Sequence, residues 1–304
     1  MLNKKIFLYE NRPNVTLTTY ILDSSPKNPA WDSRPGILIC PGGAYLYCSQ
    51  REAEPIAMAF AAMGYHAFVL NYSVYADEGG DMNPNREFVV KPERVHPTPV
   101  REVGLAMKYL TEHAAEWHLD AERIAVCGFS AGAHNAAMYG VYWNSPMVTD
   151  YLGGAYRPAA MILGYALTDF TYISRLIPKC DDQAKALFRA INIAFAGTAE
   201  PPEELLKEIS PALQVNAQTP PTFLWATADD ELVPIRNTLA MAQGLADHQI
   251  PFEVHIFERG HHGLALATQA TAKRKSQILP SAGKWVPMAG EWLKQWMPLQ
   301  VPEG

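Results

Sequence analysis

Residues 123–134 read Arg-Ile-Ala-Val-Cys-Gly-Phe-Ser-Ala-Gly-Ala-His, and this stretch decides the fold class. An apolar run typical of a buried strand leads into the pattern G-x-S-x-G at 128–132, and an alanine-rich helical segment follows. In such a strand–turn–helix the serine stands on a sharp, strained turn with its hydroxyl exposed, and only small residues fit beside it. The pattern is short enough to occur by chance, but its setting predicts that Ser130 is a nucleophile.

Strand-like and helix-like segments alternate along the rest of the chain. Short apolar runs typical of buried parallel strands are separated by segments in which apolar residues recur at helical spacing. We expect strands at 15–22, 36–40, 66–72, 123–129, 159–165, 222–227 and 252–257. We expect helices at 53–63, 100–117, 131–142 and 235–247, and a last helix whose tryptophans pack against the sheet. Since no repeat or linker appears, the pattern predicts one α/β domain over residues 1–304, with a mostly parallel sheet flanked by helices.

Two long segments interrupt this alternation. Residues 74–97 form a polar loop, and residues 170–221 contain helical pieces and several prolines. Each follows an expected strand of a mostly parallel sheet, so each should emerge at the carboxyl edge, where ligands bind in such folds. We therefore expect a small lid or cap insertion at 170–210, with the first loop helping to roof the same site.

A glycine-rich loop follows the strand expected at 36–40. Residues 41–45 read Pro-Gly-Gly-Ala-Tyr, a sequence that lets the backbone come close to a ligand. Acyl transfer builds negative charge on the carbonyl oxygen, and fixed backbone N–H groups must stabilise it. We expect these oxyanion-hole donors to be the amides of Gly43 or Ala44, together with the amide of Ala131 beside the nucleophile.

Two further segments supply partners for the serine. Asp229 and Asp230 follow the strand expected at 222–227, and His262 lies in a Gly-His-His-Gly sequence after the strand expected at 252–257. Serine needs a base to take its proton, and the base needs a carboxylate to hold its tautomer. The chain order Ser, Asp, His is that of the α/β-hydrolase triad, so we expect Ser130, His262 and one of the two aspartates to converge.

The sequence resembles the bacterial α/β-hydrolases grouped with acetyl xylan esterases and feruloyl esterases. The segments that carry this resemblance are PGGAY at 41–45, REAEPIA at 51–57, GYHAFVLNYSV at 64–74, GFSAGAH at 128–134, PPTFLWATADDELVP at 220–234 and GHHGLALA at 260–267. It implies a serine carboxylesterase that works through an acyl-enzyme and removes short acyl groups, such as acetyl, from carbohydrate fragments. Carried over by motif, the nucleophile is Ser130 and the base is His262. Counting back from residues 233–234 favours Asp230, but the G-x-x-D spacing makes Asp229 the acid, and we therefore expect Asp229 to pair with His262.

Four residues beside these motifs have other expected roles. His134 should anchor the helix that follows the nucleophile, and Glu54 should cap or pair near the loop at 41–52. Tyr45 and Trp225 lie next to site elements and are possible substrate-binding residues at the acyl pocket, although core packing explains them equally well.

Composition argues against several other functions. The net charge is −6 and the only basic run is the short one at 273–275, so no nucleic-acid partner is expected. No apolar run reaches the roughly 20 residues of a membrane helix, and the first residues lack a signal-peptide pattern, so a cytoplasmic protein is expected. The histidines and the four cysteines show no metal-ligand spacing, so we expect no metal and no cofactor. The expected partner is a small ester, possibly an acylated oligosaccharide; nothing indicates an oligomeric state.

Two other functions remain open at this stage. The DDELVP and GHHG sequences also resemble the catalytic domain of prolyl oligopeptidases, although 304 residues leave no room for the propeller that such peptidases usually carry. A non-catalytic binding protein could use the same fold, but such proteins often lose a triad member and this chain has all three types. An esterase is therefore the favoured hypothesis for the function.

Replacing the nucleophile tests this reading directly. We expect Ser130→Ala to remove hydrolysis of p-nitrophenyl acetate while the circular dichroism spectrum stays unchanged, because loss of a triad member leaves only weak residual catalysis. A variant that kept more than a few per cent of the wild-type turnover would show that another residue is the nucleophile.

Overall fold

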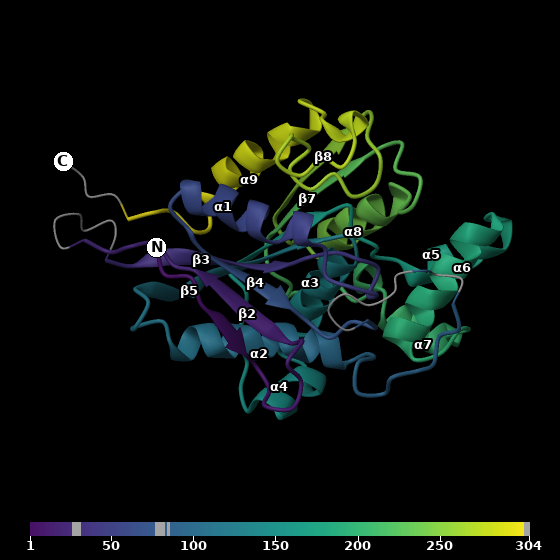
Figure 1. Ribbon diagram of the computed structural model, residues 1–304, viewed down its shortest axis with the longest axis horizontal. Helices are drawn as coiled ribbons and strands as arrows, with labels where there is room; N and C mark the ends of the chain where they lie inside the picture. Colours follow the sequence, from purple (N-terminus) through teal and green to yellow (C-terminus); the bar gives the residue numbers. More distant parts are fainter. Residues whose placement is uncertain (26–31, 77–82, 84–85, 301–304) are drawn as a thin grey trace.

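A mostly parallel sheet of eight strands forms the centre of the computed structural model, which describes residues 1–25, 32–76, 83 and 86–300 (Figure 1). The strands are β1 (Lys5–Phe7), β2 (Thr16–Tyr20), β3 (Arg34–Cys40), β4 (His66–Asn71), β5 (Leu119–Phe129), β6 (Ala160–Gly164), β7 (Thr222–Thr227) and β8 (Phe252–Phe257). Their order across the sheet is β1-β2-β4-β3-β5-β6-β7-β8. The pairs β1–β2 and β2–β4 are antiparallel, and the other pairs are parallel. The predicted mostly parallel sheet is confirmed.

Helices cover both faces of this sheet (Figure 1). They are α1 (Glu54–Ala62), α2 (Thr98–Glu112), α3 (Ala131–Tyr142), α4 (Pro146–Leu152), α5 (Phe170–Leu176), α6 (Asp182–Ile191), α7 (Glu203–Glu208), α8 (Arg236–Asp247) and α9 (Trp285–Leu293). Two elements were not expected, the short edge strand β1 and the helix α4. The helix α2 ends at Glu112 rather than at residue 117. None of the helices in the described ranges is both long enough and apolar enough to span a bilayer.

The continuous apolar strands reflect burial on both faces. In β3 the side chains of Ile37 and Ile39 join the core beneath α1 and α9, whereas Leu38 and Cys40 join the core beneath α2, α3 and α8. Successive strand residues point to opposite faces, so a strand covered on both sides needs apolar residues at every position. The tryptophans of α9 belong to the first of these cores, where Trp285 is fully buried.

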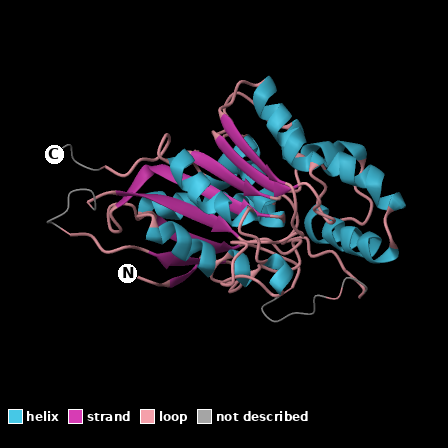
Figure 2. Cartoon of the chain, turned by 90° about the horizontal axis from the view of Figure 1, so that it is seen from above, coloured by secondary structure: helices cyan, strands magenta, loops and turns pink. Residues whose placement is uncertain are grey.

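The segment between β6 and β7 forms a separate helical group at one end of the sheet. Helices α5, α6 and α7 lie together in Figure 1, and Figure 2 shows the parallel strands directed toward them. The amide of His96 donates to the carbonyl of Phe195 at 2.7 Å, so the end of the loop expected at 74–97 contacts this group. Residues 77–82 and 84–85 of that loop lie outside the described residues.

The turn from β5 to α3 is held by close backbone contacts. Ser130 has φ 52° and ψ −122°, a conformation that costs a non-glycine residue about 1–3 kcal/mol. Its amide donates to the carbonyl of Gly164 at 3.0 Å. A Cβ at Gly128 would lie 2.3 Å from the carbonyl oxygen of Gly132, and one at Gly132 would lie 2.1 Å from that of Cys40. The two glycines of the motif are therefore required by space.

Gly132→Ala should destabilise the fold severely, because the new methyl group would meet the carbonyls of Cys40 and Pro41, which are backbone atoms that cannot turn aside. We expect a loss of about 3 kcal/mol or more in the free energy of unfolding, measured in urea. Gly154→Ala is the control, since its Cβ would lie 3.4 Å from the nearest atom. Equal stability of the two variants would contradict this account of the turn.

Candidate active site

Three side chains from separate loops form a hydrogen-bonded chain at the carboxyl edge of the sheet. The Oγ of Ser130 lies 2.8 Å from Nε2 of His262. The Nδ1 of His262 lies 2.7 Å from Oδ2 of Asp230. Ser130 follows β5, Asp230 follows β7 and His262 follows β8, so the three expected loops do meet. The arrangement matches the geometry by which a carboxylate orients an imidazole toward a serine hydroxyl.

The expected pairing of Asp229 with His262 is wrong. Asp229 is exposed, and its Oδ1 accepts a hydrogen bond from the amide of Gly260 at 2.6 Å. Asp230 points the other way into the protein, where its Oδ1 accepts from the amides of Leu232 and Val233, each at 2.9 Å. This tight turn selects the second aspartate, because adjacent side chains on a turning backbone point in different directions. The spacing back from residues 233–234 carried the right signal.

The electrostatic surroundings of His262 favour its protonated form. Burial lowers the pKa of His262, but the Asp230 carboxylate and its hydrogen bond raise it, and the net pKa is raised. The carboxylates of Glu52 and Glu231 act in the same direction. Glu231 also lies 3.6 Å from the neighbouring His261, where both side chains are exposed. These surroundings therefore stabilise an imidazolium at residue 262.

The glycine-rich loop passes beside the nucleophile. Ala44 and Ala131 line the same cavity as Ser130, whereas Gly43 does not line it. Gly43 has φ 128°, and a Cβ there would lie 2.1 Å from the carbonyl oxygen of Tyr47, so the loop needs a glycine at this position. Within the described residues, the amides of Gly43, Ala44 and Ala131 donate no hydrogen bond to the protein, whereas the amide of Gly42 donates to Glu52.

A small apolar cavity adjoins Ser130. Its volume is about 20 Å³. The apolar side chains that enclose it come from the loop after β6, from α5 and α6, and from the loop after β7: Leu167, Phe170, Phe188, Ile191, Leu232 and Val233. The helical insertion between β6 and β7 thus supplies part of its wall. Tyr45 also lines this cavity, which is one of the two placements expected for it.

His134 and Tyr45 fasten the glycine-rich loop at residues 41–45 to α3. Nε2 of His134 lies 2.8 Å from the carbonyl oxygen of Ile209 and so donates to it. Nδ1 therefore accepts from the hydroxyl of Tyr45, 2.6 Å away. Burial lowers the pKa of His134 to about 3, so the ring is neutral. His134 is a structural anchor in this arrangement, as expected.

Of the two placements expected for Trp225 the structure shows core packing, whereas the placement expected for Glu54 is not observed. Trp225 does not border the cavity, because it points to the opposite face of β7 and stacks on Trp285 with ring centroids 5.0 Å apart. Glu54 does not contact the loop at 41–52, because it is exposed and its Oε2 accepts from the hydroxyl of Tyr20 at 3.4 Å. The carboxylate that contacts that loop is Glu52, two residues earlier.

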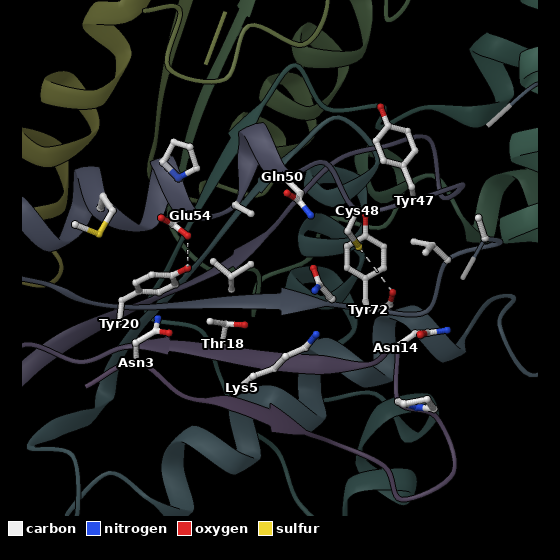
Figure 3. Close-up of a pocket in the computed structure, with 18 of the residues that line it drawn as sticks. Asn3, Lys5, Asn14, Thr18, Tyr20, Tyr47, Cys48, Gln50, Glu54 and Tyr72 are labelled. Atoms are coloured by element: carbon white, nitrogen blue, oxygen red, sulfur yellow. Dashed lines mark hydrogen bonds between the residues drawn. The ribbon is translucent and has the colours of Figure 1, made fainter. Parts of the chain in front are cut away.

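A second cavity, larger than the one beside Ser130, lies away from the nucleophile turn. This groove has a volume of about 1030 Å³ and runs over β2 and β4 beside α1. Figure 3 shows Tyr20 and Glu54 at one end of it and Tyr47 toward the other. Neither Ser130 nor His262 lines it, so size alone does not mark the reaction site here.

Metal-ligating side chains do not gather in the described part of the chain. No group of three or more histidine, cysteine, aspartate or glutamate side chains in those residues could hold a metal ion. The four cysteines, Cys40, Cys48, Cys127 and Cys180, are free thiols.

Sequence comparison relates the chain to known esterases. The model of the BD-FAE family matches residues 24–245, which include Ser130 and Asp230 but end before His262. Endo-1,4-beta-xylanase B of Butyrivibrio fibrisolvens is 30% identical over 237 residues, which cover 76% of this chain and 32% of that protein. Acetylxylan esterase of Xylanibacter ruminicola is 23% identical over 265 residues, which cover 86% of this chain and 46% of that protein. The chain thus matches 32% and 46% of the length of these two curated relatives.

Solved structures confirm the α/β-hydrolase fold. A carboxylesterase of Lactobacillus plantarum superposes with a TM-score of 0.77 at 29% identity, and the match covers 97% of this chain and 98% of that one. An acetyl ester-xyloside bifunctional hydrolase of Caldicellulosiruptor lactoaceticus superposes with a TM-score of 0.74 at 28% identity, and the match covers 96% of both chains. An α/β-hydrolase from a deep-sea metagenome is 30% identical with a TM-score of 0.71, covering 97% of both chains.

The two aspartates should respond differently to substitution. In Asp230→Asn the amide group would donate to Nδ1 of His262 and force the proton onto Nε2, so kcat should fall by about 10⁴-fold. Asp229→Asn keeps an oxygen that accepts from Gly260, so kcat should stay within a few-fold of the wild type. Steady-state kinetics on p-nitrophenyl acetate decides the matter, and the reverse order of severity would refute the assignment of the acid.

The pH dependence of kcat should follow the raised pKa of His262. The ring must be neutral to accept the serine proton, so activity should rise with pH and reach half of its maximum above about 6.5, the ordinary histidine value. A midpoint clearly below that value would contradict the stabilising role of the surrounding carboxylates.

Proposed function

This chain belongs to the BD-FAE family, and on that premise we propose that it is a serine carboxylesterase that removes acetyl and other short acyl groups from carbohydrate fragments or related small esters. The observation that carries the proposal is the Ser130–His262–Asp230 chain beside a small apolar cavity. The three side chains provide the nucleophile, the base and its orienting carboxylate, and the cavity lies where the acyl group of a bound ester would sit.

The first half of the reaction forms an acyl-enzyme. Nε2 of His262 takes the hydroxyl proton of Ser130 while Oγ forms a bond to the acyl carbon, and the carbonyl electron pair moves onto the oxygen. Asp230 holds the resulting imidazolium. The amides of Ala131 and of Gly43 or Ala44 stabilise the oxyanion. The tetrahedral intermediate then collapses, its bond to the alcohol oxygen breaks, and that oxygen takes the proton from His262.

The second half releases the acid. A water molecule gives a proton to His262 as its oxygen attacks the acyl carbon, and a second oxyanion forms in the same place. Collapse of this intermediate breaks the bond to Oγ, which regains a proton from His262. The products are a carboxylic acid and the free enzyme, so the cycle consumes one water and needs no other reactant.

The size of the cavity favours short acyl groups. A cavity needs about 10–15 Å³ of space to hold one water-sized group. The cavity beside Ser130 measures about 20 Å³, which favours the methyl group of an acetyl ester over a bulky feruloyl ring. The walls are packed aromatic and aliphatic side chains, so a longer acyl chain would have to displace Phe170, Phe188 or Ile191.

The relatives support a carbohydrate as the alcohol. One curated relative is an acetylxylan esterase, another is a xylanase, and one solved relative is an acetyl ester-xyloside hydrolase. The names of these three relatives together combine acetyl esters with xylose-containing substrates. We therefore assign an acetylated oligosaccharide or a related small ester as the substrate class.

The acyl preference should depend on Phe188. Wild-type kcat/KM should fall by at least about 10-fold from the p-nitrophenyl acetate to the hexanoate, since one methylene in a tight pocket is worth about 10-fold or more. Phe188→Ala opens one wall of the cavity and should bring the two esters close to equality or reverse their order. Measuring kcat/KM over the acetate, butyrate and hexanoate esters checks this.

The control is Leu187→Ala, which removes a comparable side chain from the same helix but does not line the cavity. It should keep the wild-type order of esters. The proposed acyl site would be wrong if Phe188→Ala kept that order as well, or if the wild-type enzyme preferred the hexanoate. Hydrolysis of aminoacyl anilides in preference to all of the esters would favour a peptidase instead.

A further inference from the structure

Glu52 is a buried carboxylate that the steps above do not use. It ends the short helical turn Gln50–Glu52 before α1, and it is 3% exposed. Its Oε2 accepts a hydrogen bond from the amide of Gly42 at 2.9 Å. Its Oε1 accepts a hydrogen bond from the hydroxyl of Tyr165 at 2.6 Å. Burying a carboxylate is costly unless it is hydrogen-bonded, and here both oxygens have a donor.

Tyr165 carries this connection to the histidine loop. Its hydroxyl oxygen accepts from the amide of Ala265 at 3.0 Å, three residues after His262. Its ring packs edge-on against the imidazole of His262, with ring centroids 5.1 Å apart. Burial raises the pKa of Tyr165 far above its ordinary value, so the phenol keeps its proton and donates it to Glu52. The phenol oxygen in turn accepts the hydrogen bond from the amide of Ala265.

The two hydrogen bonds of Glu52 therefore join both loops that meet at the nucleophile. One bond fixes the residue just before the oxyanion donors Gly43 and Ala44. The other, through Tyr165, fixes the backbone of the loop that carries His262. Gly42 itself is pressed against the nucleophile turn, because a Cβ at that position would lie 3.0 Å from Cβ of Ser130. A shift of either loop would change the distance between the oxyanion donors and the base.

We propose that Glu52 is a positioning residue for ester hydrolysis, which holds the oxyanion loop and, through Tyr165, the His262 loop in one fixed relation to Ser130. The inference rests on the proposed function, since it concerns the same reaction. It assigns no contact between Glu52 and the substrate. Reactions of this kind are sensitive to small displacements of the reacting groups, so a loss of positioning should appear in the chemical step.

Glutamate suits this place better than its amide. Glu52 faces two donors, the N–H of Gly42 and the O–H of Tyr165, and a carboxylate offers an acceptor to each. Glutamine has one acceptor oxygen, so its NH₂ group would oppose one of the two donors. The substitution Glu52→Gln therefore breaks one link with almost no change in volume.

The charge of Glu52 provides a second readout. Three carboxylates act on the pKa of His262 and raise it, those of Asp230, Glu231 and Glu52. Removing the charge at residue 52 should lower the pKa of His262, so the rise of kcat should move to lower pH. Tyr165→Phe keeps this charge and should leave the midpoint unchanged, so the midpoint separates the effect of the charge from the effect of the hydrogen bonds.

The experiment compares Glu52→Gln and Tyr165→Phe with the control Glu54→Gln. Glu54 lies on the same run of sequence but is exposed and bonded only to Tyr20 among the described residues. On p-nitrophenyl acetate, we expect Glu52→Gln and Tyr165→Phe each to lower kcat by about 10- to 100-fold with KM within about 3-fold, since one oxyanion donor alone is worth about 10²–10³. The double variant should lose little more than the worse single variant, because either substitution interrupts the same continuous chain from Gly42 through Glu52 to Tyr165. Glu54→Gln should match the wild type in kcat and in its pH midpoint.

The results separate this proposal from the proposed function. A wild-type protein that hydrolyses no ester contradicts the function, whereas active wild type with kcat unchanged in Glu52→Gln overturns only the positioning role. Losses that multiply in the double variant, or a higher KM at unchanged kcat, also overturn it. If Glu52→Gln does not fold, Tyr165→Phe carries the test, with thermal melting to confirm its fold. The rate of labelling by a fluorophosphonate, which also needs the oxyanion hole, should fall in parallel with kcat.

Discussion

The architecture of this site depends on a close contact between backbones that leaves no room for a side chain. At the start of α3, Gly132 lies against the carbonyls of Cys40 and Pro41 at the end of β3, and Gly128 lies against Gly132 itself. This contact forces the chain to turn within one residue and gives Ser130 its positive φ of 52°. The same contact brings the amide of Ala131 next to the loop that follows Cys40. Ser130 and the glycine-rich loop are therefore neighbours, because the backbones of the strand end and of the helix start are in direct contact.

The remaining groups reach this point because parallel strands end at a common edge. The loops after β7 and β8 bring Asp230 and His262 to within hydrogen-bond distance of each other. Negative charge surrounds the imidazole of His262 and raises its pKa, and in the proposed reaction it would stabilise the cation that appears only after proton transfer. The hydrogen bonds of Glu52 and Tyr165 connect the first loop to the last, so the site is cross-linked across the sheet rather than built from independent loops.

Much of this arrangement could be predicted from the sequence, because its signals are local. Apolar runs gave the strands, and the elbow motif identified Ser130 and, through chain order, His262. The choice between Asp229 and Asp230 depends on which way a tight turn directs each side chain, and spacing alone did not decide it. Trp225 stands beside the site in sequence but on the opposite face of β7, since strand residues alternate. The sequence around Glu52 does not indicate its role, because Gly42 and Tyr165 contact it only in the folded protein.

The walls of the cavity beside Ser130 come from two different parts of the chain. Its floor comes from the nucleophile turn and the loop after β3, whereas Phe170, Phe188 and Ile191 come from the helices inserted between β6 and β7. No member of the Ser130–His262–Asp230 chain lies on that insertion. Mutations there can reshape the acyl pocket while the proton-transfer apparatus stays intact. Among enzymes with this arrangement, sequence changes that alter the substrate range should therefore concentrate between β6 and β7. The residues proposed to carry out the chemistry should change more slowly.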